Sequence, residues 1–371
     1  MDINTPYSSW KFVHHPDVMR ELQAGSHPSP VQVHFVISDT CNHRCSFCAY
    51  RWDGYQSAEN FLERDADGKV TNFNPKRQIP TDKAFEILDD CARMGVRAIQ
   101  YTGGGEPLMH PEHARLFKRT LALGMDLALV TNGSLLTVPV MDLLGQAHWV
   151  RVSLDAATPH TYSELRRVGV GQFDKTVANI KQLVKVQRRP TSRSDLLVGV
   201  GFVVGHGNYH EAVDAIKLCA DLGVDNVRIS AAFTPEGIFY HSGYYEQLSE
   251  DLREAVAKYA RPDFHIFNLF GDRIEDLKQR SPDYQRCYMM QLVPYIGADL
   301  NVYRCCMLAY NDQGLLGSIA ERSFQALWQS DEVIADFAGF DAHDCPPCMF
   351  NRKNDFIGYC VVNDPQHVNF I

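Results

Sequence analysis

Six short apolar runs, separated by segments with the pattern of amphipathic helices, constrain the fold of this chain more than any other feature. Each run is rich in Val, Ile and Leu and nearly continuous, which is typical of strands buried in a parallel sheet. Strands that alternate with helices predict an α/β protein, because each parallel connection needs a crossover. A partly closed (β/α)6 barrel and a doubly wound open sheet both satisfy this pattern. The runs comprise residues 31–38, 96–102, 126–132, 148–154, 196–204 and 225–230.

We expect the partial barrel, similar in plan to a TIM barrel, with functional residues at the carboxyl ends of its strands. A long polar insertion, residues 50–79, follows the first strand and leaves from the rim where the chemistry is expected. We interpret it as a lid, and a disordered loop is the alternative. The chain divides into an N-terminal extension, the barrel, a helical connector where the alternation stops, and a small cysteine-containing unit. These four parts comprise residues 1–30, 31–235, 236–286 and 287–371.

The composition narrows the possible functions. The chain has 371 residues, a formal net charge of −9 and 45% hydrophobic residues. The densest basic stretch, residues 185–193, is typical of a solvated helix end, so we expect no nucleic-acid partner. No apolar run approaches the roughly 18 residues of a membrane span, and the N-terminus lacks a secretory signal. We therefore expect a cytoplasmic protein without a membrane partner.

The cysteines are numerous and clustered. The chain contains 11 of them, and in a reducing compartment clustered cysteines indicate metal binding or catalysis rather than disulfides. Cys91 and Cys219 stand apart, in helical patterns typical of buried thiols. The first group comprises Cys41, Cys45 and Cys48, and the second lies among Cys287, Cys305, Cys306, Cys345, Cys348 and Cys360.

The first group lies in the segment CNHRCSFC, immediately after the first predicted strand. Three thiolates at this spacing can surround one face of a 4Fe–4S cluster and leave one iron open. A ferredoxin usually closes that position with a fourth cysteine. Structural zinc is the competing interpretation, although its cysteines usually come as spaced pairs.

This segment resembles the CxxxCxxC motif of the radical S-adenosylmethionine (SAM) superfamily. The resemblance implies that Cys41, Cys45 and Cys48 hold a 4Fe–4S cluster whose open iron binds SAM. It further implies that one electron cleaves SAM into methionine and a 5′-deoxyadenosyl radical, which abstracts hydrogen from a substrate. Phe47 matches an aromatic residue of the motif that packs near the SAM adenine.

The segment YTGGGEP, at the end of the second predicted strand, resembles the GGE motif of the same superfamily. Consecutive glycines let a backbone approach a ligand closely, and a carboxylate suits the SAM amino group. Weaker matches lie at the ends of later strands, where Arg167 is an alternative to Arg166 and Asn208 replaces a residue that is often acidic. The resemblance assigns SAM binding to Gly103, Gly104, Gly105, Glu106, Asn132, Ser153, Asp155 and Arg166.

The C-terminal cysteines combine a CxxC pair with a predicted hairpin over residues 294–305, with Gly297 at its turn. This layout resembles the twitch domain, a shortened SPASM domain that holds one auxiliary 4Fe–4S cluster. Zinc is the alternative metal, since CxxC pairs suit it well. The resemblance makes Cys287, Cys305, Cys345 and Cys348 the cluster ligands.

Two further cysteines have open roles. Cys306 is the alternative to Cys305 as a ligand, because the two are adjacent. Cys360 is a bystander, an extra ligand or a hydrogen donor to a substrate radical, and we expect its replacement by alanine to change product partitioning without loss of the cluster.

The resemblance predicts an oxidoreductase, because an auxiliary cluster can accept an electron from a substrate radical. It implies dehydrogenation or epimerisation of a small polar metabolite such as a sugar or cyclitol, with an external electron donor of flavodoxin or ferredoxin type. Modification of a ribosomal peptide is the alternative, which we disfavour because only about 30 residues precede the barrel. An iron–sulfur scaffold protein is the non-enzymatic alternative, but a scaffold needs no SAM-binding motif.

Overall fold

The computed structural model describes residues 5–50, 62–64, 70–73, 77–362, 366 and 369. Most of the insertion 50–79 lies outside these residues, apart from an antiparallel pair formed by β2 (Leu62–Arg64) and β3 (Val70–Phe73). The lid that the sequence predicts there therefore stays a prediction.

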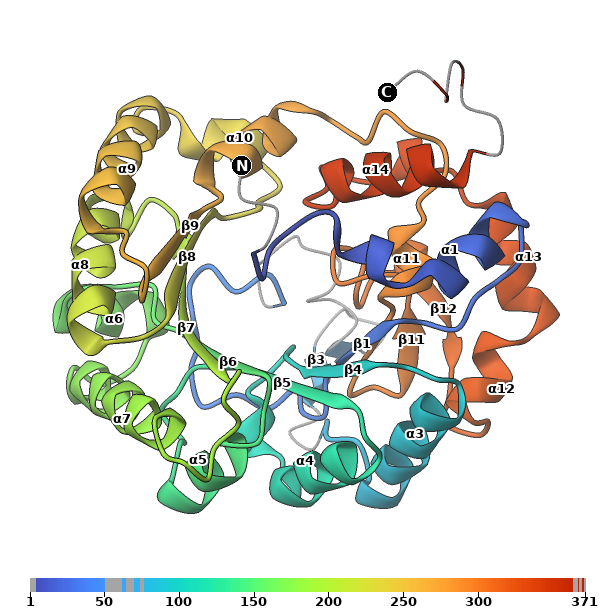
Figure 1. Cartoon of the computed structure of the whole chain (residues 1–371), viewed down its shortest axis with the longest axis horizontal. Coiled ribbons are helices and arrows are strands. Elements are labelled where there is room, and N and C mark those ends of the chain that lie inside the picture. Colours follow the sequence, from blue (N-terminus) through green and yellow to red (C-terminus); the bar gives the residue numbers. More distant parts are fainter. Residues whose placement is uncertain are drawn as a thin grey trace.

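All six apolar runs form strands, and neighbouring strands pair in parallel, as expected. The sheet has 10 strands and is not closed, since β12 and β9 form its two edges. Figure 1 shows a curved sheet with helices around its convex side, which is a partial barrel. In sheet order the strands are β12 (Leu315–Ser318), β11 (Asn301–Tyr303), β10 (Tyr295–Ile296), β1 (Gln32–Phe35), β4 (Ala98–Tyr101), β5 (Asp126–Thr131), β6 (Trp149–Ser153), β7 (Leu197–Val204), β8 (Asn226–Ala231) and β9 (His265–Asn268).

The outer helices follow the strands in chain order and cover the convex face (Figure 1). Their amphipathic patterns bury one side against the sheet, which provides most of the stability of such helices. They are α3 (Thr81–Arg93), α4 (His113–Ala122), α5 (Val138–Leu144), α6 (Pro159–Arg166), α7 (Gly171–Gln187), α8 (Ala212–Leu222), α9 (Tyr245–Tyr259) and α10 (Phe270–Lys278). Short 3-10 turns intervene at η2 (Pro107–Met109), η3 (Tyr209–Glu211) and η4 (Gly237–His241).

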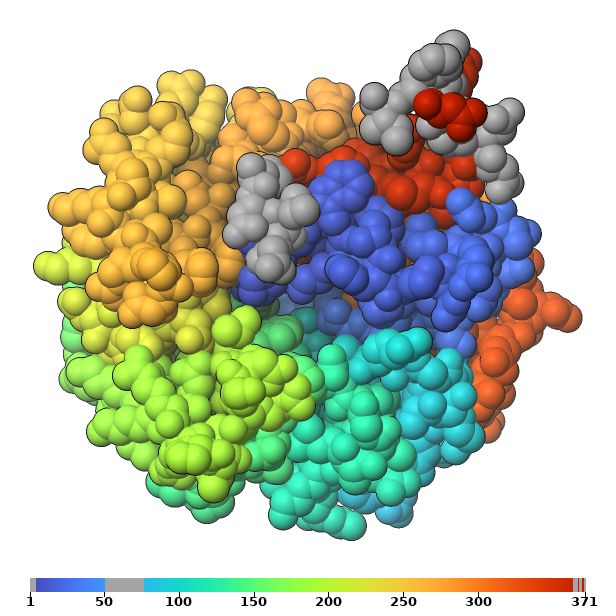
Figure 2. Space-filling model, viewed as in Figure 1, coloured from blue at the N-terminus to red at the C-terminus, as the bar shows by residue number. Residues whose placement is uncertain are grey.

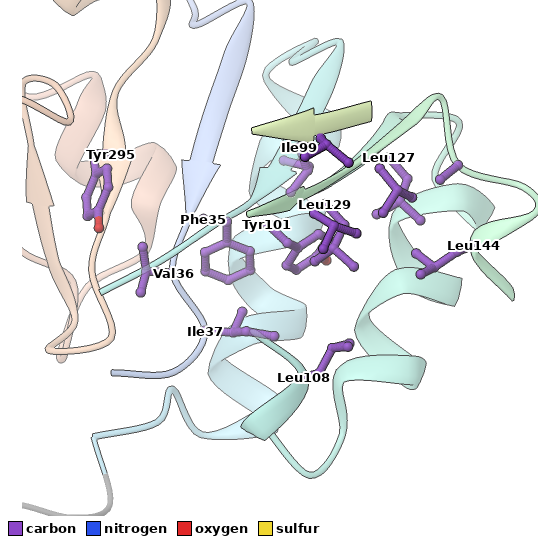
Figure 3. Close-up of a cluster of buried hydrophobic side chains, with 14 of the residues drawn as sticks. Phe35, Val36, Ile37, Ile99, Tyr101, Leu108, Leu127, Leu129, Leu144 and Tyr295 are labelled. Atoms are coloured by element: carbon purple, nitrogen blue, oxygen red, sulfur yellow. The ribbon is translucent and has the colours of Figure 1, made fainter. Parts of the chain in front are cut away.

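The two faces of the central strands differ in polarity. Phe35, Ile99 and Leu129 are fully buried and pack in one hydrophobic core with the helices (Figure 3). In β1 and β4 these buried residues alternate with half-buried ones such as His34 and Gln100. The expectation of strands buried among apolar groups on both faces is therefore only half right, because polar side chains lie on the concave face.

The predicted helical connector, residues 236–286, also contains a strand. α9 leads into β9, which pairs in parallel with β8 and is followed by α10. The strand–helix alternation thus continues for one more unit than the sequence indicated. β9 has only four residues, and none of them is fully buried, so it lacks the apolar signal of the other strands.

The predicted C-terminal hairpin is confirmed, since β10 and β11 pair in antiparallel register. At its turn, a side chain on Gly297 would come within 2.3 Å of an oxygen of Asp299, so only glycine fits. β10 also pairs in parallel with β1, which extends the central sheet into the C-terminal region. The remaining elements there are α11 (Met289–Leu292), η5 (Asp312–Gly314), α12 (Phe324–Trp328), α13 (Asp331–Gly339), η6 (Ala342–Asp344) and α14 (Asn351–Val361).

The two ends of the described chain lie side by side. η1 (Lys11–His14) and α1 (Pro16–Gln23) lie beside α14, and Figure 2 shows the N-terminal segment next to this helix on one face. A second, smaller core joins the two ends, with Met19, Leu22 and Ile357 among its buried members. Within the described residues, no helix that would cross a bilayer is found.

Candidate active site

The first cysteine group lies in the loop after β1, with Cys41, Cys45 and Cys48 all half-buried. The amide of Arg44 donates to the carbonyl of Arg166 (3.0 Å), and the amide of Ser46 donates to that of Leu165 (2.8 Å). These carbonyls lie in the last turn of α6, where helix carbonyls lack partners of their own. The end of α6 therefore fixes the cysteine loop.

Arg166 is the central side chain of this region. Its guanidinium donates to the thiol sulfur of Cys45 (3.3 Å) and to the carbonyl of Ser153 (2.6 Å), and it pairs with the Asp155 carboxylate. It also lies 5.6 Å from the ring centre of Phe47, within cation–π range. Burial disfavours the charged form of Arg166 and lowers its pKa. Cys45 and Asp155 outweigh this effect, so the pKa is raised overall. Arg166 thus places a permanent cation beside the cysteines.

Arg167, the alternative to Arg166, points away from this region. It is exposed and has a left-handed backbone conformation (φ 49°) that ends α6. The structure therefore brings Arg166, and not Arg167, together with the predicted site residues.

Asp155 is buried and has φ 56°, an unusual backbone conformation for a residue other than glycine. Its side chain accepts a hydrogen bond from the Val203 amide (2.6 Å), and its carbonyl accepts one from the amide group of Asn208 (2.9 Å). Burial raises the pKa of Asp155, while the Arg166 guanidinium opposes this rise. The uncharged Asn208, which departs from the acidic residue of the family pattern, therefore supports the Asp155 loop.

Glu106 is buried at the end of β4 and accepts three hydrogen bonds. Its donors are the hydroxyl of Thr131 (2.7 Å) and the amides of Asn132 (2.7 Å) and Leu108 (3.2 Å). Burial raises its pKa, and these three donors act in the opposite direction. The carboxylate thus joins the ends of β4 and β5. Each carboxylate oxygen has two acceptor sites, so Glu106 keeps capacity for one further donor.

The glycines before Glu106 let two loops meet. A side chain on Gly104 would come within 2.3 Å of an oxygen of Asp39, and one on Gly105 within 2.3 Å of the carbonyl of Thr40. The amides of Gly105 and Glu106 donate to the carbonyls of Ser38 and Thr40, at 3.1 and 2.9 Å. The glycines are therefore needed where the end of β4 packs against the start of the cysteine loop.

Asn132 connects the end of β5 to the same loop. Its side-chain amide donates to the side-chain oxygen of Asn42 (2.8 Å), which lies next to Cys41. Asn42 in turn donates to the hydroxyl of Ser134 (2.8 Å). The structure thus gathers the predicted SAM-binding residues at the carboxyl ends of β4, β5 and β6, beside the three cysteines.

The second cysteine group lines a single pocket, which contains Cys287, Cys305, Cys345 and Cys348. Cys306 does not line it, although it is adjacent to Cys305. Burial and the neighbouring thiol of Cys348 raise the pKa of Cys287 and of Cys345 to about 12. Thiols in this setting become thiolates when they bind a metal centre, whose positive charge replaces their protons.

The lining of the second cysteine pocket fits an iron–sulfur cluster. Among the described residues, no three His, Cys, Asp or Glu side chains converge as ligands of one metal ion would. An apolar pocket with four cysteines fits such a cluster, which is buried and held by thiolates.

Cys360 lies apart from both cysteine groups. It packs at the edge of the small core formed by α1 and α14, and its carbonyl accepts a hydrogen bond from the side chain of Gln23 (2.7 Å). It does not line the cysteine pocket. Its role as a hydrogen donor stays a prediction that none of its described contacts favours.

Two polar networks around the site were not predicted. Asp39 accepts from the hydroxyl of Tyr310 (2.6 Å) and pairs with Arg77 (3.1 Å), which links the cysteine loop to the C-terminal region. Glu211 accepts from the Ala157 amide (2.6 Å) and from the Thr161 hydroxyl (2.6 Å), which holds α6. Their partners lie far apart in sequence and belong to no motif, so no local signal indicated them.

A partial parallel barrel that carries three cysteines after its first strand and four in a neighbouring pocket belongs to the class of iron–sulfur proteins with two cysteine sites. Residues 35–203 match the sequence model of the radical SAM superfamily, and residues 287–350 match that of SPASM, an iron–sulfur cluster-binding domain. The chain belongs to the radical SAM superfamily, as a SPASM-type enzyme. Its cofactors are a 4Fe–4S cluster, auxiliary iron–sulfur clusters and SAM.

The chain is 30% identical over 288 residues to the AdoMet-dependent heme synthase of Methanosarcina barkeri, a match that covers 72% of this chain and 78% of that one. It is 28% identical over 205 residues to the pre-heme d1 synthase of Dinoroseobacter shibae, covering 55% of this chain and 43% of that one. It thus spans less than half of the second relative. SuiB of Streptococcus suis, bound to its precursor peptide SuiA, has a similar fold (TM-score 0.60, 15% identity, 91% of this chain and 73% of that one).

Proposed function

We propose that this enzyme is an oxidoreductase that removes hydrogen from a small-molecule substrate and passes an electron to one auxiliary cluster. The observation that carries the proposal is the pocket lined by Cys287, Cys305, Cys345 and Cys348, at the edge of the sheet that also holds the Cys41–Cys48 loop. An electron acceptor beside a radical site suits a net oxidation, because the substrate radical must lose a further electron.

The residues around the first cysteine group have separate roles in this proposal. Cys41, Cys45 and Cys48 hold the 4Fe–4S cluster, which with bound SAM supplies a 5′-deoxyadenosyl radical. Glu106 and the carbonyls of Gly103, Gly104 and Gly105 receive the SAM amino group. Arg166 pairs with the SAM carboxylate, since its Nε atom is buried and has no hydrogen-bond partner.

The adenosine part of SAM lies along the next strand ends in this proposal. Phe47 packs near the adenine, and Asn132, Ser153 and Asp155 face the ribose. Arg166 also stabilises the thiolate of Cys45, because a cation near a thiolate lowers the cost of its charge.

A haem-type tetrapyrrole is the substrate class that we place first. The two relatives described above are both named for haem synthesis, and the longer match covers 72% of this chain. This choice replaces the sugar or cyclitol that the motif resemblance first favoured. The likeness to SuiB shows the fold alone and does not support a peptide substrate. Modification of a peptide is therefore one of the results that would contradict the tetrapyrrole proposal. The electron donor in the proposal is an external flavodoxin or ferredoxin.

The test is anaerobic reconstitution followed by incubation with SAM and dithionite. We expect about eight iron and eight sulfide per chain, four for each cluster, and formation of 5′-deoxyadenosine. Replacing Cys41, Cys45 and Cys48 together by alanine should abolish 5′-deoxyadenosine, whereas the same change at Cys91, a buried helical cysteine, should not. Absence of 5′-deoxyadenosine from the unmodified enzyme would disprove the proposed chemistry.

Substrate class is tested separately by adding candidate compounds to the reconstituted enzyme. A tetrapyrrole carboxylate that becomes oxidised, with 5′-deoxyadenosine formed in step, is the expected result. Oxidation of a sugar or crosslinking of a peptide in its place would contradict the tetrapyrrole proposal while leaving the radical chemistry intact.

A further inference from the structure

Two arginines on strands of the partial barrel and one lysine on a C-terminal helix have no carboxylate within ion-pair distance among the described residues. They are Arg151 on β6, Arg228 on β8 and Lys353 on α14, and we name them the cation cluster. The side chain of Arg151 donates to the hydroxyl of Tyr7 at 3.4 Å. The Nε atom of Arg228 is buried and has no hydrogen-bond partner. A buried cation without a counter-charge is costly, which makes such groups rare.

Other arginines in the interior differ from the cation cluster in this respect. Each has a side chain that is at most 15% exposed, and each pairs with a carboxylate. Among the described residues, carboxylates therefore neutralise these buried cations but form no ion pair with the cation cluster. The pairs are Arg77 with Asp39, Arg166 with Asp155, Arg273 with Asp276 and Arg304 with Asp336.

Glycines on the strand between the two arginines leave room for them. Gly201 on β7 pairs with Arg228 on β8, and a side chain at Gly201 would contact the Arg151 side chain at 3.4 Å. Arg228 lies 5.7 Å from the ring centre of Tyr7, whose ring packs edge-on against Phe267 at 4.7 Å. The arginines are thus held by aromatic contacts, which keep them in place without cancelling their charge.

Members of the cation cluster lie near each of the two cysteine sites. Arg151 lies two positions before Ser153 on β6, and the carbonyl of Ser153 accepts a hydrogen bond from Arg166 (2.6 Å) on the SAM side. Lys353 lies in the first turn of α14, which begins directly after Cys348 and Phe350 of the cysteine pocket. A substrate that meets a radical on one side and an electron acceptor on the other would lie here.

The electrostatic environment of the cluster is consistently positive. Burial, followed by the charges of Lys11, Arg273 and Arg228, lowers the pKa of Lys353 to about 8. Burial, followed by Arg151 and Lys353, lowers the pKa of His34 to about 4, so this histidine stays neutral near pH 7. Among the described residues, no carboxylate forms an ion pair with these cations, so an anionic ligand can balance their charge.

We propose that Arg151, Arg228 and Lys353 bind the anionic groups of the substrate, which carries at least two carboxylates or phosphates. This inference rests on the proposed function, because it places the substrate between the two cysteine sites. The shared chemistry is an oxyanion that accepts hydrogen bonds from guanidinium and ammonium groups. Such a ligand supplies the counter-charge that the protein itself omits.

Binding to the anaerobically reconstituted enzyme with SAM tests the proposal without turnover. The probes are coproporphyrin III, with four carboxylates, and GTP, with a triphosphate, each measured by equilibrium dialysis. We expect one of them to bind, and Arg228→Met to weaken that binding at least tenfold. Arg193→Met is the matched control, because Arg193 is paired with Asp195 away from the site. The probe that binds identifies carboxylate or phosphate as the recognised group.

The stability of the ligand-free enzyme gives an independent readout. Because Arg228 has no counter-charge, Arg228→Met should leave the melting temperature unchanged or raise it by about 2–4 °C. Replacement of a residue with a purely structural role would lower the melting temperature. Arg151→Met provides a second variant with the same expectations.

Three outcomes would overturn the proposal: neither probe binds, the variants bind as tightly as the unmodified enzyme, or Arg228→Met lowers the melting temperature. Binding of a hexaglutamate peptide with neither small probe would also overturn it in favour of an acidic peptide. Formation of 5′-deoxyadenosine, measured on the same samples, separates the two proposals. If it forms but no anion binds, only the cation cluster has been misassigned.

Discussion

Arg166 links more of the candidate site than any other residue. It contacts Cys45, Asp155 and the carbonyl of Ser153, and the carbonyl of Arg166 itself anchors the cysteine loop. The sequence suggested only that Arg166 or Arg167 pairs with a carboxylate. The helix end decides between them, because the left-handed conformation at Arg167 turns that side chain outward.

Arg166→Met should destabilise the protein by about 3–5 kcal/mol, because it leaves Asp155 as a buried carboxylate without its partner. Denaturant unfolding of the unreconstituted protein measures this loss. Arg167→Met is the matched control and should change the free energy of unfolding by less than about 0.5 kcal/mol. Equal effects of the two substitutions would show that the Arg166–Asp155 pair does not hold the site.

The cysteine doublet gives a second prediction at this scale. Cys305→Ala should reduce the iron content of the reconstituted enzyme from about eight to about four per chain, because it removes a ligand of the auxiliary cluster. Cys306→Ala should leave about eight, since Cys306 does not line the pocket. Iron analysis, together with electron paramagnetic resonance of the reduced protein, distinguishes the Cys305→Ala variant from the Cys306→Ala variant. The reverse pattern would make Cys306 the ligand.

At the scale of elements, α6 is held at both ends by groups from other parts of the chain. Its start is fixed by Glu211, which accepts hydrogen bonds from the amides of Ala157 and Thr158 and from the hydroxyls of Thr158 and Thr161. Its end carries the cysteine loop. The position of the cysteine loop thus depends on Glu211, which follows the loop by about 160 residues in the sequence.

Glu211→Gln should lower the stability of the fold at pH 7 by about 2 kcal/mol, because an amide group replaces an acceptor that faces several donors. Burial raises the pKa of Glu211, but the hydrogen bonds outweigh it and lower the pKa below its usual 4.5. The stabilisation is therefore complete above the unfolded pKa and is lost as the pH falls through the lower folded pKa.

Unfolding measured between pH 7 and pH 3 checks this prediction. The unmodified enzyme should lose stability below about pH 4.3, and Glu211→Gln should lose less over the same range. Glu164→Gln, on the exposed side of α6, should behave like the unmodified enzyme. Parallel pH profiles for all three proteins would contradict the role of Glu211.

The strands show which elements the sequence can predict. β1 and β4–β8 were found because each contains several fully buried apolar residues, which mark a strand locally. β9 was missed because its four residues are all partly exposed. The pairing of β10 with β1 joins segments about 260 residues apart, and no local pattern records such a contact.

The residues of the candidate site also divide into those that a sequence motif indicates and those that no motif indicates. The cysteines, Glu106 and Asp155 belong to motifs with fixed spacing, so a resemblance indicated them. Arg151 and Arg228 carry no motif, and each appears in sequence as an ordinary charged residue within a strand. The proposal for these two arginines therefore needed the folded structure, in which neither forms an ion pair with a described carboxylate.

At the scale of the whole molecule, the C-terminal region is joined to the barrel. One hydrophobic core includes Val33 of β1 together with Tyr303 and Phe337 of the C-terminal region. The polar network of Asp39, Arg77 and Tyr310 crosses the same boundary. Both cysteine sites are therefore attached to adjacent strands, β1 and β10.

This continuity predicts that the two regions unfold together. Trp149 lies on β6, and Trp328 lies on α12, where its ring nitrogen donates to the carbonyl of Pro28 (3.0 Å). In variants that keep only one of these tryptophans, the others being replaced by phenylalanine, thermal unfolding followed by fluorescence should give the same midpoint. A shared core and a continuous sheet make separate melting costly, because either part would expose the surface that the other covers. If Trp328 reports an earlier transition than Trp149, the C-terminal region folds as an independent unit, and the shared sheet does not couple the two cysteine sites.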